Sequence, residues 1–173
     1  MNINFRAINK RDIKDFEVLE KWHNDEEIKP FLVPNRDGKP LKHWSAEDLM
    51  FGSISNPKKY AYFILDGEKL IGDFSIDTNF SQLKGDSESA AWISICIGEK
   101  EYWGTGASAK AMEFIDEICK ELKMKRIELG VFMFNLRAVS FYKRIGYEPF
   151  ETVESYAFYN GEWYDDVRME KLL

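Results

Sequence analysis

Cysteine and histidine are scarce in this chain of 173 residues, which has two of each. Cys96 and Cys119 fall in apolar surroundings, one on an expected strand and one on an expected helix, so they form neither a disulfide framework nor a metal-ligand pattern. His23 and His43 do not add such a pattern. We therefore expect no metal, and the cysteine usage fits a reducing compartment.

A long apolar run is missing as well. No stretch approaches the roughly 20 apolar residues that cross a membrane, and Met1–Arg6 has no apolar signal core. We expect a cytoplasmic protein without a membrane partner. Positive charge is not in excess either, because the net charge is −6. That charge disfavours nucleic acid as a partner and mildly favours a cationic one, although solubility alone explains it equally well.

No repeat, linker or low-complexity tract interrupts the chain, which predicts a single domain over residues 1–173. Residues 2–8 alternate as a strand, and a helical period begins at Asp12 and ends near Asn24. Ser45–Asp48 resembles a capping box and predicts another helix. Between these two helices, residues 25–44 are rich in proline and predict an irregular, mobile loop, which is either functional or a simple connector.

Two turns predict hairpins towards the two ends of the chain. Asp66-Gly67 joins strands at 60–65 and 70–78, and Asn160-Gly161 joins strands at 147–158 and 162–172. Between the hairpins the pattern reads strand, helix, strand, helix, at 92–97, 107–122, 126–132 and 135–145. A polar loop at 80–88 precedes this central unit. The order predicts an α+β fold.

The central unit contains a turn with two glycines, Gly104 and Gly106, between its first strand and its first helix. Glycine lets the backbone approach a ligand closely, and the free N–H groups of such a turn lie at the positive end of a helix. That arrangement attracts phosphate. We therefore expect the turn to hold the pyrophosphate of a cofactor.

Gly104-Thr-Gly-Ala-Ser-Ala109 matches the dinucleotide-binding pattern G-x-G-x-x-A, and Glu128 follows at a suitable distance. In that pattern, however, the first glycine follows its strand almost at once, whereas Glu99–Trp103 intervenes here. The upstream chain is also a hairpin meander rather than the start of a doubly wound sheet. A Walker phosphate loop is excluded, because no Gly-Lys-Ser/Thr follows.

A second interpretation covers nearly the whole chain. The strand, Glu-Tyr-Trp-Gly-Thr-Gly, a helix and a further strand lead into Asn135-Leu-Arg-Ala-Val-Ser-Phe-Tyr-Lys-Arg-Ile-Gly-Tyr147, and this succession resembles the GNAT acetyltransferase superfamily. The terminal Tyr159–Met169 is similar to the last hairpin of ribosomal-protein and polyamine acetyltransferases. The resemblance implies a GNAT fold, with a mixed, twisted sheet of about seven strands and helices on both faces. It also implies acetyl-coenzyme A as cosubstrate.

By the same resemblance, the pantetheine arm pairs with the strand at Ile95, Cys96 and Ile97. The pyrophosphate lies on the N–H groups of Trp103, Gly104, Thr105, Gly106, Ala107 and Ser108. Two departures from the family pattern, Glu101 at its first position and Thr105 where Lys or Arg is common, put the phosphate affinity in question.

Asn135 and Tyr142 are expected at the thioester end of the cofactor. Asn135 also fits a helix cap, and the two roles are compatible. Tyr142 is the candidate acid, because a phenol near the sulfur can protonate the departing thiolate. The alternative for Tyr142 is a core tyrosine, since it shares a helical face with Ala138 and Ile145.

The base is harder to locate. Many relatives carry a Glu on the strand before the glycine turn, where this chain has Trp92, which cannot take a proton. Glu88 is the preferred substitute, with Asp77, Asp73 or a water chain as alternatives. Trp92 itself either walls the acceptor site or belongs to the core. Asp165 and Asp166 could attract an amine, although exposed strand acids are usually just solvated.

The expected activity is the transfer of acetyl from acetyl-coenzyme A to a primary amine by direct attack in a ternary complex. The strand ending at Ile97 would stabilise the oxyanion with its N–H groups. The expected acceptor is a small cationic molecule or a protein N-terminus. The alternatives are a non-catalytic acyl-coenzyme A binding module and a dinucleotide-binding oxidoreductase. A homodimer is a further expectation.

Overall fold

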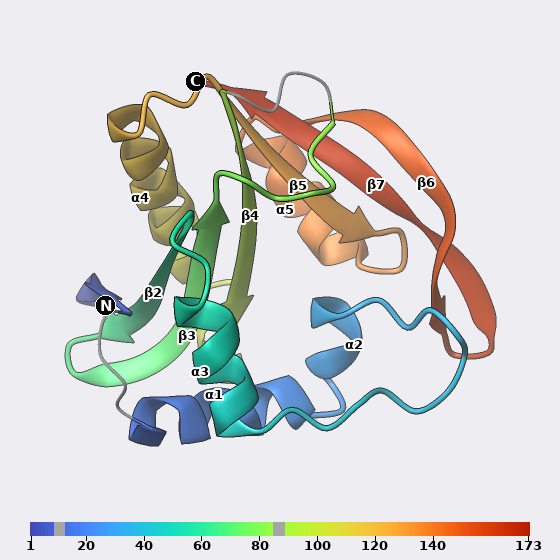
Figure 1. The fold of residues 1–173 in the computed structure, drawn as a ribbon, viewed down its shortest axis with the longest axis horizontal. Coiled ribbons are helices and arrows are strands. Elements are labelled where there is room, and N and C mark those ends of the chain that lie inside the picture. The colour runs from blue at the N-terminus through green and yellow to red at the C-terminus, as the bar shows by residue number, and fades with distance from the viewer. Residues whose placement is uncertain (9–12, 85–88) are drawn as a thin grey trace.

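The computed structural model describes residues 1–8, 13–84 and 89–173, and within them the chain forms seven strands and five α-helices (Figure 1). The elements in chain order are β1 (Ile3–Ala7), α1 (Ile13–Asn24), α2 (Lys29–Leu32), α3 (Ala46–Ile54), β2 (Lys59–Asp66), β3 (Lys69–Asp77), β4 (Ala90–Ile97), the 3-10 turn η1 (Lys100–Tyr102), α4 (Ala107–Glu121), β5 (Arg126–Phe132), α5 (Leu136–Arg144), β6 (Glu148–Tyr159) and β7 (Glu162–Leu172).

The strands form one mixed sheet in the order β1-β2-β3-β4-β5-β7-β6. Neighbouring strands are antiparallel, apart from β4 and β5, which run parallel. A parallel pair needs a crossover connection, and α4 supplies it. Both turns of the Asx-Gly type connect antiparallel strands, as the sequence predicted.

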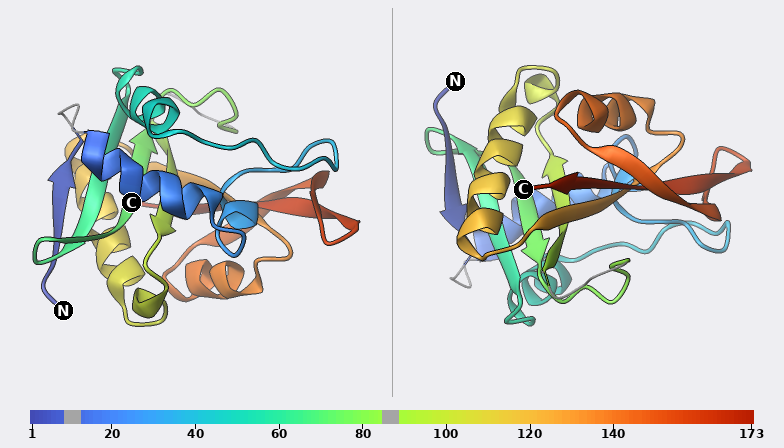
Figure 2. Two further views of the ribbon diagram at one scale, coloured as in Figure 1. Left: turned by 90° about the horizontal axis from the view of Figure 1, so that it is seen from below. Right: turned by 90° about the horizontal axis from the view of Figure 1, so that it is seen from above.

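Helices cover both faces of the sheet (Figure 2). On one face, α1 buries Phe16, Leu19 and Trp22 against strand residues that include Phe63 and Cys96. On the other face, α4 buries an apolar stripe that includes Ala111, Met112 and Ile115. Full burial of a Leu, Ile, Phe or Met side chain contributes about 1.5–3 kcal/mol, so the two apolar layers fix how the helices dock.

The sheet opens between β4 and β5. These strands pair over a short stretch, with Ala90–Trp92 of β4 in register with Arg126–Glu128 of β5. From Ile93 onward, β4 continues along β3 as far as Ile97 but is no longer in register with β5. Figure 1 shows the two strands diverging from their common start. One edge of β4 is therefore left open in the middle of the sheet.

The segment 25–44, predicted as wholly irregular, contains the short helix α2. Pro30 lies in its first turn, where the missing N–H costs nothing. Buried Ile28 anchors the start of the helix to the core beneath α1. A helix of four residues is too short for a helical period to show in the sequence. Asp12, the expected start of the first helix, lies outside the described residues.

The predicted cap of α3 is confirmed, because the Ser45 side chain accepts a hydrogen bond from the backbone N–H of Asp48. Within the ranges described above, no helix is long and apolar enough to span a membrane.

Candidate active site

A cavity of about 1050 Å³ runs through the gap between β4 and β5. Its walls come from both faces of the sheet. On the side of α4 and α5 they include the glycine turn and residues of α5, and on the other side they include α2, the loop after it and the hairpin of β6 and β7. A ligand of this volume could reach from one face of the sheet to the other.

The glycine turn forms one end of this cavity. Gly104 and Gly106 both have left-handed backbone conformations, with φ of +75° and +96°, which only glycine adopts easily. Gly106 is the N-cap of α4, and no side chain among the described residues caps the helix there. The first N–H groups of α4 are therefore available to an anion.

Four of the six turn residues expected to hold pyrophosphate line the cavity, namely Trp103, Gly104, Gly106 and Ser108. Ala107 is fully buried in the core beneath the turn. The Thr105 hydroxyl donates to the Tyr102 carbonyl, at 2.7 Å, which stabilises the turn. The Trp103 indole N–H donates to the Ile97 carbonyl, also at 2.7 Å, and so ties the turn to the end of β4.

Glu101, the acidic departure from the family pattern, does not line the cavity. Its carboxylate lies 2.6 Å from the ammonium of Lys69, at the start of β3. Lys69 also contacts Glu99, at 3.1 Å. The Glu101 carboxylate is thus directed to Lys69 rather than into the cavity.

Two arginines on α5 that the sequence analysis did not single out also line the cavity, Arg137 and Arg144. The Arg137 guanidinium lies over the Trp103 ring, 4.2 Å from its centroid. Arg137, Ser140, Phe141 and Arg144 are spaced by three and four residues, which places them on one face of the helix. That spacing was a readable signal, and these arginines bring positive charge to the wall of the cavity.

The open edge of β4 presents backbone groups to the cavity. The Gly98 N–H donates to the Ile71 carbonyl, at 2.9 Å, so residue 98 is bonded to β3. In an antiparallel pair the bonding direction alternates, and the backbone N–H and C=O groups of Ile95 and the N–H of Ile97 consequently point away from β3, towards the gap. The Ile97 carbonyl is taken up by the Trp103 indole. Cys96 lies in the cavity wall, but its side chain is packed in the core under α1.

Asn135 and Tyr142 both line the cavity on the α5 side. Asn135 caps its helix by accepting from the Ala138 N–H, at 3.2 Å. The Tyr142 side chain is half-buried, and burial raises its pKa to about 12. Such a phenol stays protonated at neutral pH, so it can donate a proton but not accept one.

The other end of the cavity is aromatic. Phe31 of α2, Phe132 and Phe134 around the end of β5, and Tyr156 of β6 line it. Trp92 lies there too, stacked on Phe80 with ring centroids 4.6 Å apart. Trp92 is therefore part of the wall of the cavity.

An irregular stretch of β6 brings Tyr156 to this wall. Pairing with β7 shifts register between Val153 and Ala157, and Ser155 inside the shift has a left-handed φ of +48°. The Ser155 N–H is held by the Asp165 carboxylate, at 2.9 Å. A bulge of this kind redirects side chains, and here Tyr156 packs under the Arg36 guanidinium, 3.6 Å from its ring centroid.

Asp166 also lines this end, and the expectation that it is an exposed, solvated acid is wrong. It is 2% exposed and forms an ion pair with Arg168, with 2.8 Å between Oδ2 and Nε. The reason is the alternation of β7, which points Asp166 and Arg168 to the same covered face. Burial raises the pKa of Asp166 to about 6, although Arg168 and Arg36 oppose the rise.

The other proposed bases lie elsewhere. Burial raises the pKa of Asp73 to about 7, but this residue is not among those lining the cavity. The Asp77 carboxylate accepts from the Asn56 amide, at 3.2 Å. Glu88, the preferred choice from the sequence, lies outside the described residues. Within the described part of the chain, no group of three His, Cys, Asp or Glu side chains is arranged to hold a metal ion.

A gap between parallel strands, with uncapped helix N–H groups at one end and an aromatic compartment at the other, suits group transfer from a phosphate-bearing donor to a second small molecule. A family model described as an acetyltransferase (GNAT) domain matches residues 5–168. The chain belongs to this family and is a GNAT acetyltransferase. The family, the fold and the enzyme class inferred from the sequence are thereby confirmed, against the binding-module and oxidoreductase alternatives.

Relatives agree over nearly the full length. The L-amino acid N-acetyltransferase AaaT of Escherichia coli K12 is 28% identical over 170 residues, which cover 96% of this chain and 97% of that protein. The spermidine N-acetyltransferase of Vibrio cholerae, in complex with CoA and spermine, superposes with a TM-score of 0.78 at 21% identity, covering 99% and 95% of the two chains. The ribosomal-protein-alanine N-acetyltransferase of Brucella melitensis gives 0.77 at 15% identity, covering 98% and 99%.

Proposed function

We propose that this chain binds acetyl-coenzyme A in the gap between β4 and β5 and transfers the acetyl group to the primary amine of a small molecule, with an amino acid as the favoured acceptor. The observation that carries the proposal is the cavity that passes through the sheet, because it lets donor and acceptor enter from different faces and meet at the open edge of β4.

The donor half has a group for each part of the cosubstrate. The N–H groups at the start of α4, with Arg137 over the adjoining Trp103 ring, suit the phosphates, and Arg144 adds a second positive charge to the cavity wall. The backbone of Ile95 can pair with the amides of the pantetheine arm. An N–H group on the same edge can stabilise the oxyanion that forms when an amine attacks the thioester carbonyl.

Tyr142 suits the role of acid. When the C–N bond forms and the C–S bond breaks, the sulfur leaves as a thiolate, which takes a proton. The raised pKa of Tyr142 keeps its hydroxyl protonated at neutral pH. No residue needs to carry the acetyl group, so the reaction proceeds by direct attack in a ternary complex.

The charges of the acceptor half favour an amino acid over a polyamine. Arg36 and Asp166 both line this end, so a zwitterion would find a partner for its carboxylate and another for its ammonium. A polycation would be repelled by Arg36. Glu27 is a further acid on the wall, but its carboxylate is already paired with Lys100. The full-length match to an L-amino acid N-acetyltransferase supports the same choice. A homodimer stays a prediction.

The test is an acceptor panel assayed by release of free thiol from acetyl-coenzyme A. The panel holds amino acids, the matching amines without a carboxylate, polyamines and peptides with a free N-terminus. We expect amino acids to give the highest kcat/KM. Faster turnover of the matching amines or polyamines would refute the choice of acceptor, and no turnover with any amine would refute the whole proposal.

Tyr142→Phe tests the acid. We expect kcat to fall by roughly 100-fold or more, because general acid catalysis contributes about 10²–10⁴. Affinity for coenzyme A, measured by calorimetry, should stay nearly unchanged. Tyr147→Phe is the matched control. This substitution also removes a phenol hydroxyl, but Tyr147 is buried in the core next to Tyr142 and is not among the residues lining the cavity. Equal losses in both variants would contradict the assignment.

A further inference from the structure

Asp166 is a buried carboxylate that faces the acceptor half of the cavity. It extends from β7, opposite Phe132 of β5. Next to it, Gly130 has no side chain, and a Cβ atom at that position would lie 2.7 Å from Asp166 Oδ2 and 3.0 Å from the Trp92 ring. Glycine at this position therefore lets the carboxylate and the indole approach the same part of the cavity.

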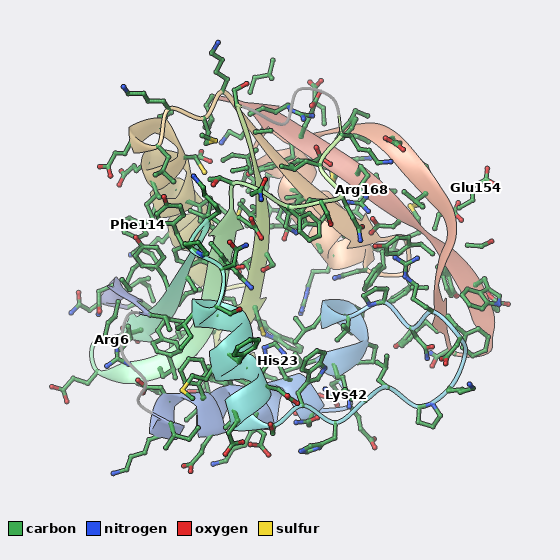
Figure 3. All side chains as sticks on the ribbon, viewed as in Figure 1. Arg6, His23, Lys42, Phe114, Glu154 and Arg168 are labelled. Atoms are coloured by element: carbon green, nitrogen blue, oxygen red, sulfur yellow. The ribbon has the colours of Figure 1, made fainter. Side chains whose placement is uncertain are left out.

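Arg168, labelled in Figure 3, holds this carboxylate from one side. The Arg168 guanidinium is 2% exposed, lies 4.8 Å from the centroid of the Trp92 ring, and donates to the Gln82 side chain at 3.0 Å. An arginine that is fixed in this way orients the carboxylate. Because Arg168 does not line the cavity while Asp166 does, the carboxylate is the member of the pair that a ligand meets.

We propose that Asp166 binds the ammonium group of the acceptor and takes its proton before attack on the thioester. The inference rests on the proposed function. It assigns the base to β7, across the gap from the open edge of β4.

The step balances as follows. The ammonium, R–NH₃⁺, transfers one proton to the Asp166 carboxylate, which leaves a neutral amine with a free electron pair. That pair forms the C–N bond with the acetyl carbon, and the C–S bond breaks. The thiolate takes a proton from Tyr142, and the remaining excess proton on nitrogen returns the phenoxide to its neutral form through solvent. Asp166 releases its proton to water, so one proton leaves per turnover.

The charges around Asp166 suit this role. Among the described residues, Arg168 on its own strand and Arg36 on the loop after α2 act on Asp166, and both favour the carboxylate form. Arg168 in turn lies over the ring of Tyr156 on β6 and is within electrostatic reach of Glu128 on β5. Burial raises the pKa of Asp166 to about 6, so it is ionised at pH 7 and can still accept a proton.

The experiment is the pH profile of kcat/KM for the wild-type protein and for Asp166→Asn, with the best acceptor of the panel. The wild type should lose activity on the acid side with a pKa near 6. Asp166→Asn should be slower by roughly 100-fold at pH 7, and its deficit should shrink as the pH rises, because a larger fraction of the acceptor is then already a free amine. Affinity for coenzyme A should not change.

Glu162→Gln is the matched control. It removes one carboxylate charge from an exposed position of the same strand, at a residue that is not among those lining the cavity. Its pH profile should coincide with that of the wild type. A deficit of Asp166→Asn that is the same at every pH, or an acid limb that survives the substitution, would overturn the proposal.

Removing one partner of a buried ion pair can unfold a protein, so a second measurement uses the wild type alone. Two acceptors whose amines differ in pKa should give the same acid limb, because that limb belongs to the enzyme. A limb that moves with the acceptor's pKa would overturn the assignment. If the wild type acetylates no amine, the proposed function fails and this inference fails with it. If the wild type turns over normally and the pH profile of Asp166→Asn equals that of the wild type, this inference alone is refuted.

Discussion

Gly98 lies directly after β4, against the indole of Trp22 from α1. A Cβ atom at position 98 would come within 1.9 Å of Trp22 Cδ2 and within 2.4 Å of two further ring atoms. Trp22 is 6% exposed, and its indole N–H donates to Glu99, at 3.1 Å. Since the backbone of Gly98 is not left-handed, the requirement for glycine here is one of space rather than of conformation.

Gly98→Ala should therefore destabilise the protein. The ring cannot move aside without breaking its hydrogen bond and disturbing the core under α1. Overpacking of a core by one methyl group typically costs about 1–3 kcal/mol, and a direct overlap of this size belongs at the upper end. For a chain of this length each kcal/mol lowers Tm by roughly 2–4 °C, so we expect a decrease of about 4–12 °C.

We would measure this loss of stability by thermal and urea unfolding, monitored by tryptophan fluorescence and by far-UV circular dichroism. Gly52→Ala is the matched control, because Gly52 lies inside α3 and no described atom lies within 4 Å of the added Cβ. Alanine in place of an exposed helical glycine should stabilise by about 0.5–1 kcal/mol. The same substitution thus has opposite signs at the two sites. A Gly98→Ala protein as stable as the wild type would refute the packing of Trp22 described above.

Two further predictions concern charge. Arg137→Ala should weaken binding of coenzyme A roughly tenfold, because a charge-assisted contact is lost at an exposed site, whereas Lys143→Ala on the same helix should leave it unchanged. Calorimetry at two salt concentrations measures both affinities, and equal affinities of the two variants for coenzyme A would contradict the phosphate role of Arg137. Burial lowers the pKa of His23 to about 4, so protonation favours the unfolded chain, and stability should be fully present above pH 6.5 and decline towards pH 4. Urea unfolding should show a loss of about 2 kcal/mol between pH 7 and pH 5 that His23→Gln largely removes, and an equal loss in both proteins would exclude His23 as its source.

Most of the fold could be predicted because it depends on local signals. The hairpin turns, the Ser45 cap and the apolar periods of α1 and α4 each occur within a few consecutive residues. The glycine turn could be placed for the same reason, since Gly104 and Gly106 adjoin the helix whose start they shape. Helix α2 could not be predicted, because a single turn leaves too few residues for a period to show.

The acceptor half could not be predicted either, because its residues come from distant parts of the chain. Asp166 and Asp165 look alike in the sequence, and the pairing of β7 with β5 decides which one is buried. The sequence gives no reason for a glycine at position 130, because the reason is the close approach of Trp92 and Asp166 in the folded chain. The arginines of α5 were visible as a helical stripe, but nothing local showed that the stripe faces the glycine turn.

The bulge of β6 has a consequence for how this protein can change. The donor half is built from ladder hydrogen bonds and from the start of α4, where a substitution disturbs the whole sheet. Tyr156 and Arg36, by contrast, lie on a bulge and on a loop, where replacements, insertions and deletions leave the ladder intact. The wall formed by these two segments can therefore change without altering the glycine turn or the open edge of β4.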